Sequence, residues 1–195
     1  MMQRIHITGG PGSGKTTAGR RIASGLSMPF HELDPILDQI LIDSGEGIDR
    51  SRWEDRARAM AGEDAWVSDG AYFDWAQPLL DRAELVLWLD LPWSVACYRI
   101  LVRHLKAELA RTNQYPGLRR LGTFWMWSYR YYHDTNPHSL NPWGVPRTRS
   151  RAVEELSRYE QKLVVCRSKR DVDLRVAELL GTTWSSPQEG STPSD

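Results

Sequence analysis

The sequence predicts an α/β fold of three layers, a parallel five-stranded sheet with helices on both of its faces. Short apolar runs alternate with longer segments of helical character along most of the chain, which is typical of parallel strands joined by helices. A turn rich in glycine, residues 9–14, also joins the first apolar run directly to the first helical segment. In such folds, ligands bind at the carboxyl edge of the sheet.

The composition indicates a single globular domain. The chain has 195 residues, of which 41% are apolar and 26% are charged, as in ordinary folded proteins. We expect this domain to span residues 1–180, and residues 181–195, rich in Ser, Thr, Pro and Glu, to be a disordered tail. No apolar run approaches the roughly 18 residues that cross a bilayer, and residues 1–14 lack a signal peptide's apolar core, which predicts a cytoplasmic protein without membrane contact.

Five apolar runs predict the strands of the sheet. They cover residues 3–8, 28–33, 65–68, 85–89 and 163–166. The run at 85–89 is apolar at every position, as expected of a strand that is buried on both faces. The sequence contains no internal repeat, and the alternation of strands with helices implies that the sheet is parallel.

Seven segments of helical character accompany these strands. They cover residues 14–26, 35–42, 51–61, 92–110, 118–132, 151–159 and 172–180. Proline suits a first helical turn, which places helix starts at Pro35 and Pro92. Ser51 with Glu54 has the S-x-x-E pattern of a capping box, which places a third start at Ser51. Loops are predicted around 45–47 and over 136–146, where Gly, Pro and Asn gather.

The helical segment 118–132 is rich in large apolar side chains. This much apolar area predicts a helix that packs over another part of the protein, which the sequence does not identify. The side chains concerned are Leu118, Leu121, Phe124, Trp125, Trp127, Tyr129, Tyr131 and Tyr132.

Charge is distributed unevenly along the chain, although the formal net charge is zero. Residues 31–98 carry 15 acidic and 5 basic side chains, whereas residues 99–151 carry 2 acidic and 10 basic ones. The basic segment either attracts an anionic ligand or is an ordinary solvated surface.

A phosphate-binding loop follows the first predicted strand. The pattern G-x-x-x-x-G-K-[ST] is met by Gly9-Gly10-Pro11-Gly12-Ser13-Gly14-Lys15-Thr16, with an apolar strand before it and a helix after it. Glycines let the backbone curl so that its N–H groups point inward, and the helix start adds a positive dipole end. The motif predicts that a nucleoside triphosphate, taken as ATP, is bound by this loop together with Thr17, and that Lys15 reaches its β- and γ-phosphates.

A magnesium ion is expected beside these phosphates. The hydroxyl of Thr16 can ligate Mg²⁺, and an aspartate near the strand ends would be a second oxygen ligand. Asp69 is the best candidate because it follows the strand at 65–68 and therefore lies at the carboxyl edge of the sheet. The alternative is that Asp69 and Gly70 only form a turn.

Three further residues are candidates for the chemistry. Asp34 follows the second strand, where a carboxylate could accept a proton from an acceptor hydroxyl; alternatively, it caps the helix that begins at Pro35. Arg99 and Arg103 lie four residues apart on one predicted helix face, so both can point at one anion. The alternative for these arginines is a solvated helix surface.

Several motifs together resemble the adenylate-kinase-like P-loop proteins, in particular the group called DNA topology modulation proteins. The resemblance covers about residues 1–180. It rests on Gly9 to Thr16, on Leu33-Asp34, on Trp66 to Tyr72, on Leu87 to Pro92, and on Arg167 to Arg170.

The resemblance implies a lid, roughly residues 99–150, that closes over the nucleotide and whose arginines, here Arg99 and Arg103, contact its base and phosphates. It also implies that Arg167, Ser168 and Lys169 cradle the base. Adenylate kinases carry an arginine after the Asp-Gly of the third strand, whereas Ala71 follows here, so adenylate kinase activity is not expected. Kinases for shikimate or gluconate use an aspartate after the second strand beside the acceptor hydroxyl, and Asp34 occupies that place.

Two hypotheses follow. The first is an ATP-dependent phosphotransferase with an unidentified small-molecule acceptor. Its catalytic groups are Lys15, Asp34, Arg99 and Arg103, and its metal ligands are Thr16 and Asp69. The second is a nucleotide-switched regulatory ATPase, with or without a role in DNA topology, in which the aromatic segment moves with the bound nucleotide. No nucleic-acid-binding motif supports a DNA partner, and nucleotide phosphates explain the basic segment equally well.

Overall fold

A parallel sheet of five strands forms the centre of the protein. A computed structural model describes residues 3–34, 50–110, 118–140 and 146–181 of the chain. The strand order is β2-β3-β1-β4-β5, and every neighbouring pair is parallel. The bounds are Arg4–Gly9 for β1, Phe30–Glu32 for β2, Trp66–Asp69 for β3, Leu85–Leu89 for β4 and Leu163–Cys166 for β5.

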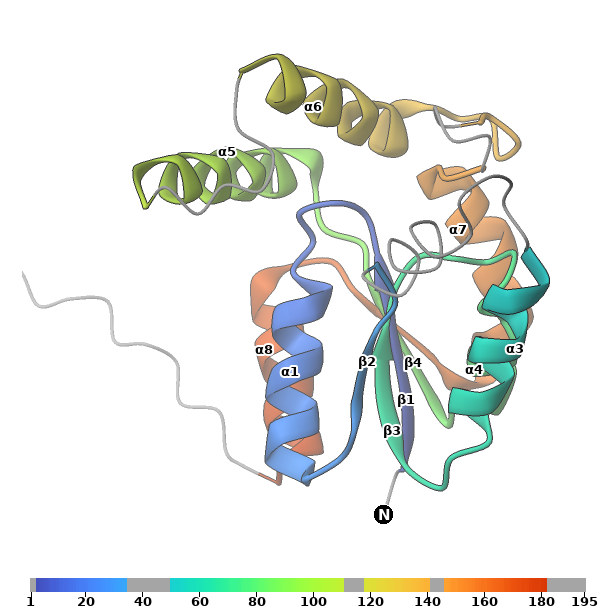
Figure 1. The fold of residues 1–195 in the computed structure, drawn as a ribbon. Coiled ribbons are helices and arrows are strands. Elements are labelled where there is room, and N and C mark those ends of the chain that lie inside the picture. The colour runs from blue at the N-terminus through green and yellow to red at the C-terminus, as the bar shows by residue number, and fades with distance from the viewer. Residues whose placement is uncertain (1–2, 35–49, 111–117, 141–145, 182–195) are drawn as a thin grey trace, which may run out of the picture.

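Helices cover both faces of this sheet, so the predicted three-layer α/β fold is confirmed (Figure 1). One face carries α1 (Lys15–Leu26) and α8 (Lys169–Leu179). The other face carries α3 (Arg50–Ala61), α4 (Gln77–Arg82) and α7 (Arg149–Leu156).

The alternation of side chains along the strands builds two cores. Successive side chains point to opposite faces. Thus Ile5, Ile7 and Leu87 pack with Ile22 of α1 on one face. On the other face, the core residues include Val86, Trp88, Leu79, Leu80, Trp53 and Leu156.

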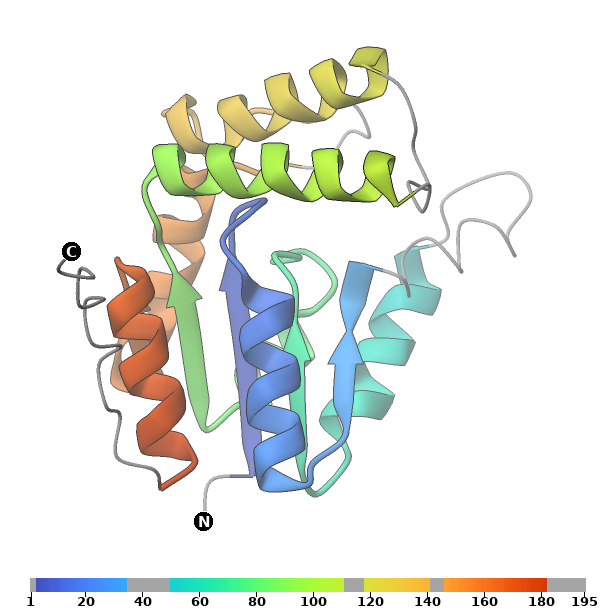
Figure 2. The same cartoon turned by 90° about the vertical axis from the view of Figure 1, so that its left-hand side faces the viewer.

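Two further helices lie over the carboxyl edge of the sheet, α5 (Trp93–Leu109) and α6 (Leu118–His133) (Figure 2). Trp93 of α5 joins them. Its ring centroid lies 5.4 Å from that of Trp125 and 5.4 Å from that of Tyr132. The aromatic side chains of the predicted helix at 118–132 therefore pack in part against α5, which is the partner that the sequence did not identify.

Several predicted helix boundaries are wrong. The helix predicted at 151–159 begins at Arg149, capped by Thr148, and ends at Leu156. A 3-10 helix, η1 (Ser157–Lys162), follows it, because the backbone of Tyr159 is not helical (φ −118°, ψ 20°). The last helix begins at Lys169, three residues before the predicted start, because Ser168 and Asp171 form a capping box there.

Two other differences concern the helices on the face of the sheet that carries α3, α4 and α7. The short helix α4 was not predicted, although Pro78 in its first turn is a typical start signal. Helix α3 begins at Arg50, so Ser51 lies inside its first turn rather than at the cap position.

Some predictions fall outside the described residues. These are the whole helix at 35–42, the loop at 45–47, residues 141–145 of the loop at 136–146, and the tail from residue 182 onward. Within the described ranges, no helix combines the length and apolar character that a membrane span requires.

Candidate active site

The candidate site lies at the carboxyl edge of the sheet, between β1 and β3. The loop after β1 leads to α1 on one face, whereas the chain after β3 leads to α4 on the other face. Neighbouring parallel strands whose connections diverge in this way leave a crevice where ligands bind in α/β proteins. The predicted phosphate-binding loop, residues 9–16, and Asp69 both reach this crevice.

The phosphate-binding loop has the backbone that its glycines predict. Gly12 and Gly14 have φ angles of 74° and 93°, values that side chains with a Cβ rarely adopt. Gly14 precedes the first residue of α1, so the positive end of this helix faces the loop. A Cβ at Gly12 would lie 2.7 Å from the carbonyl oxygen of Ala96, so α5 leaves no room for a larger residue there.

A cavity of about 440 Å³ opens beside this loop. Most of the predicted site residues line it, including Lys15, which makes no ion pair with a residue of the described ranges. The described lining residues are Gly9, Pro11, Gly12, Gly14, Lys15, Thr16, Thr17, Asp34, Ala71, Arg99, Ile100, Arg103, Phe124, Trp127, Tyr131 and Arg147.

Thr16 and Asp69 meet as the magnesium prediction requires. The Thr16 hydroxyl donates a hydrogen bond to Oδ2 of Asp69 at 2.6 Å. Mg²⁺ is commonly held by one or two such oxygen ligands together with phosphates and water, so this pair fits the ion. No larger cluster of carboxylate, His or Cys ligands exists among the described residues.

The environment of Asp69 disfavours its ionised form. Burial raises the pKa of Asp69 to about 6, although the Thr16 hydrogen bond and the charge of Lys15 act in the opposite direction. A divalent cation beside the carboxylate would favour the ionised form. A metal ion at Thr16 and Asp69 would therefore lower the pKa of this carboxyl group again.

Asp34 lies on the same cavity and is held by Tyr72. The Tyr72 hydroxyl donates to Oδ1 of Asp34 at 2.5 Å. Leu33 and Asp34 are themselves helical, so a cap role for Asp34 in front of Pro35 does not match the observed start. Asp34 therefore presents a carboxylate to the cavity from a fixed position.

Three arginines line the cavity, two of which were predicted. The guanidinium of Arg99 donates to the carbonyl oxygen of Ser13 at 2.7 Å, which fixes it above the phosphate-binding loop. Arg103 lies over the ring of Phe124, with 5.8 Å to the centroid. The third is Arg147, which lies 3.8 Å from the ring centroid of Tyr72 and thus close to the group that holds Asp34.

Helix α6 contacts the loop directly. The Tyr132 hydroxyl donates to the carbonyl oxygen of Pro11 at 3.0 Å. A Cβ at Gly10 would overlap the ring of Tyr131, so the second glycine of the motif allows this close approach. The aromatic helix therefore packs on the phosphate-binding loop as well as on α5.

The predicted base-binding residues lie apart from the cavity. Arg167 follows β5 and is not among the described lining residues. Its backbone N–H donates to Oδ2 of Asp171, and the Ser168 hydroxyl accepts from the Asp171 N–H. This segment serves as the cap of α8, and its role toward a base stays a prediction.

Arg147 and Tyr72 are the site residues that the sequence analysis missed. Tyr72 belongs to the motif Trp66 to Tyr72, from which the resemblance implies no function for this tyrosine. Arg147 follows the Pro- and Asn-rich stretch 136–146, and in the sequence only its place in the basic segment 99–151 marks it. Contacts between positions 72 and 147, which are distant in the sequence, carry no local signal.

Comparison with known proteins agrees with this architecture. A shikimate kinase from Bacteroides thetaiotaomicron is similar in structure, with 20% sequence identity over 93% of this chain and 99% of that chain and a TM-score of 0.52. The chain has a P-loop NTPase fold. No family model and no curated protein matches the sequence.

Two more distant solved structures also cover most of the chain. A shikimate kinase from Acinetobacter baumannii in complex with shikimate is 15% identical over 92% of both chains, with a TM-score of 0.47. A gluconokinase from Sinorhizobium meliloti is 18% identical over 92% of this chain and 94% of that chain, with a TM-score of 0.46. The shikimate kinase from Bacteroides thetaiotaomicron shows the fold alone, and the resemblance to the topology modulation group stays a prediction.

Proposed function

We propose that this protein is an ATP-dependent phosphotransferase that moves the γ-phosphoryl group to a small hydroxylated acceptor. One observation carries the proposal: Lys15, Thr16 and Asp34 line a single cavity, and Asp69 accepts a hydrogen bond from Thr16. Phosphoryl transfer needs groups that hold phosphates and a carboxylate that meets the acceptor, and these residues would supply both.

The phosphate-binding loop would hold the triphosphate. Its inward N–H groups and the start of α1 bind phosphate oxygens, and the Lys15 ammonium neutralises charge on the β- and γ-phosphates. Arg99 and Arg103 add positive charge from α5. Magnesium, held by Thr16 and Asp69, would supply further charge neutralisation when bound.

Asp34 would position and deprotonate the acceptor. The acceptor oxygen forms a bond to the γ-phosphorus while the bond from that phosphorus to the β,γ-bridging oxygen breaks, and the hydroxyl proton passes to the Asp34 carboxylate. The hydrogen bond from Tyr72 orients this carboxylate. Arg147, stacked on Tyr72, is suited to an anionic group of the acceptor.

A transfer assay tests this function. Radiolabelled ATP is incubated with hydroxylated small molecules and nucleoside monophosphates, and labelled products are separated. We expect one compound class to be phosphorylated, and Asp34→Asn to lower the rate about 100-fold or more, the usual range for loss of a general base. Asp64→Asn, an exposed aspartate at the amino end of β3, is the matched control and should retain full activity.

A nucleotide-switched regulatory protein is the second candidate. The contact between Tyr132 of α6 and Pro11 favours it, because a helix that packs on the phosphate-binding loop could respond to the bound nucleotide. This candidate predicts ATP binding with no labelled acceptor in the transfer assay. A DNA-binding form of it further predicts DNA affinity that falls steeply with salt.

A further inference from the structure

A histidine is buried in the core beneath the candidate site. His6 is 1% exposed and lies on β1, where the register of the sheet pairs it with Ser68 of β3. The neighbouring core side chains on this face of the sheet are apolar and include Trp66, Val86 and Trp88. A polar side chain in such surroundings costs free energy unless its hydrogen bonds are made, so the partners of the His6 ring decide what it contributes.

Two groups, one on β3 and one in the turn after it, bind the ring. Nδ1 of His6 lies 2.8 Å from the Ser68 hydroxyl. Burial lowers the pKa of His6 to about 4, although a hydrogen bond with the Gly70 backbone acts in the opposite direction, so the ring is neutral at physiological pH. A neutral imidazole has one donor and one acceptor. Because the Gly70 N–H is donated to Ile7 at 3.0 Å, the ring donates to the Gly70 carbonyl oxygen and accepts from Ser68.

These two partners flank Asp69, the proposed magnesium ligand. Ile7 and Asp69 are paired in the register, so both side chains point to the face of the sheet that carries α1. There the Thr16 hydroxyl donates to Asp69 at 2.6 Å. His6 binds the residues before and after Asp69 from the opposite face. The carboxylate is thus fixed by a histidine on one side of the sheet and by a helix on the other.

The turn after β3 also contacts the residues that hold Asp34. A Cβ at Gly70 would lie 2.9 Å from the side chain of Leu33 and 2.9 Å from that of Tyr72, so both pack directly on this turn. Leu33 immediately precedes Asp34, and the Tyr72 hydroxyl donates to the Asp34 carboxylate. The position of Gly70 therefore affects both carboxylates of the candidate site.

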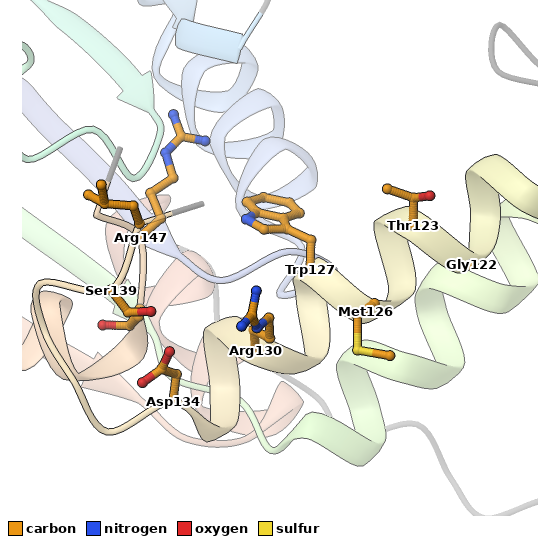
Figure 3. Close-up of a pocket in the computed structure, with 10 residues that line it drawn as sticks. Gly122, Thr123, Met126, Trp127, Arg130, Asp134, Ser139 and Arg147 are labelled. Atoms are coloured by element: carbon orange, nitrogen blue, oxygen red, sulfur yellow. The ribbon is translucent and has the colours of Figure 1, made fainter. Parts of the chain in front are cut away.

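Tyr72 in turn supports Arg147. The guanidinium of Arg147 lies 3.8 Å from the ring centroid of Tyr72. It points away from Arg130 and Asp134, which line a second cavity beside α6 (Figure 3). The turn that His6 binds is therefore also in contact, through Tyr72, with a cation of the candidate site.

We propose that His6 is a positioning residue for magnesium: its hydrogen bonds with Ser68 and Gly70 hold Asp69 where the carboxylate can ligate the ion beside Thr16. His6 acts through these neighbours, because it is not among the described residues that line the phosphate cavity. The inference rests on the proposed function, which supplies the nucleotide and the metal ion.

Calorimetric titration with ATP, once with excess Mg²⁺ and once with EDTA, tests the proposal. The ratio of the two dissociation constants measures how much the metal strengthens nucleotide binding. His6→Phe keeps a ring but removes both hydrogen bonds, and it should lower this ratio about tenfold or more, the usual effect of losing a group that orients a metal ligand. The dissociation constant in EDTA should equal that of the parent, because the phosphate-binding loop and Lys15 are unchanged.

Three further variants separate positioning from stability. His6→Gln keeps an amide N–H that can donate to Gly70, so it should restore part of the ratio. Ser68→Ala removes only the hydroxyl bond and should lower the ratio less than His6→Phe does. Leu156→Ala, at a buried position of α7 in the same core, is the destabilised control. It should lower the urea midpoint of unfolding, because it leaves a cavity, and keep the ratio of the parent.

Two results would overturn this inference alone: a folded His6→Phe protein with the ratio of the parent, or one whose affinity falls equally with Mg²⁺ and with EDTA. If His6→Phe does not fold, an unchanged ratio in folded Ser68→Ala overturns it instead. Failure of the proposed function is seen in the parent chain. A parent that binds no ATP, or that gains nothing from Mg²⁺, refutes the nucleotide or the magnesium site, and this inference with it.

Discussion

Replacement of Gly12 by alanine tests the geometry of the phosphate-binding loop most sharply. Gly12 has a φ of 74°, and a left-handed backbone costs an L-residue about 1–2 kcal/mol. The added Cβ would also lie 2.7 Å from the carbonyl oxygen of Ala96 and 3.1 Å from its carbonyl carbon. These are backbone atoms of α5, so relief requires movement of that helix, which costs about 1–3 kcal/mol as overpacking does.

The two costs together predict that Gly12→Ala lowers the free energy of unfolding by about 2–5 kcal/mol. Urea unfolding followed by far-UV circular dichroism measures this loss. Gly122→Ala is the matched control: it lies inside α6, and a Cβ there would meet no atom within 4 Å. The free energy of unfolding of this control should rise by about 0.5–1 kcal/mol, because alanine has a higher helix propensity than glycine. Equal stability of Gly12→Ala and the parent would refute the described loop geometry.

Two other substitutions give clear expectations. Asp69→Asn should change the pH dependence of stability: burial raises the pKa of Asp69 from 3.8 to about 6, so the folded parent holds a proton that the unfolded chain releases. The parent should therefore lose stability relative to the variant as pH rises from 4 to 6. Urea unfolding at several pH values measures this, and a difference in free energy of unfolding between parent and variant that stays constant from pH 4 to 6 would contradict it. Arg149→Met should destabilise the fold by about 1–3 kcal/mol, because it leaves the buried carboxylate of Asp90 without two hydrogen bonds of 2.7 Å. Thermal unfolding measures this loss, and Arg82→Met, with an expected change within about 0.5 kcal/mol, is its control.

The elements with strong local signals could be predicted from the sequence. All five strands lie within one residue or two of the predicted runs. The signal is strongest for β4 and β5, which are apolar at every position, as buried parallel strands often are. The glycine motif predicts the start of α1, because Gly14, the last glycine before Lys15, directly precedes the helix. Helices α7 and α8 begin earlier than predicted because Thr148 and Ser168 cap them.

The candidate site could be predicted only in part, for a physical reason. Lys15, Thr16 and Asp69 lie close together because the carboxyl ends of parallel strands lie at one edge of the sheet. Residues that directly follow predicted strands can therefore be assigned to this edge from the sequence. The contact of Arg147 with Tyr72 joins positions that are distant in the sequence, and that of Tyr132 with Pro11 depends on how α6 lies over the sheet. That arrangement is set by long-range packing around Trp93, which no local pattern encodes.

Isothermal titration with Mg·ATP tests the central claim most directly. The account predicts saturable heat from a single site in the parent chain and a loss of affinity of about tenfold or more in Lys15→Ala, whose fold should be unchanged because its side chain is not part of either core. Absence of heat from the folded parent, or equal affinity in the two proteins, would contradict the assignment of this loop as a triphosphate site.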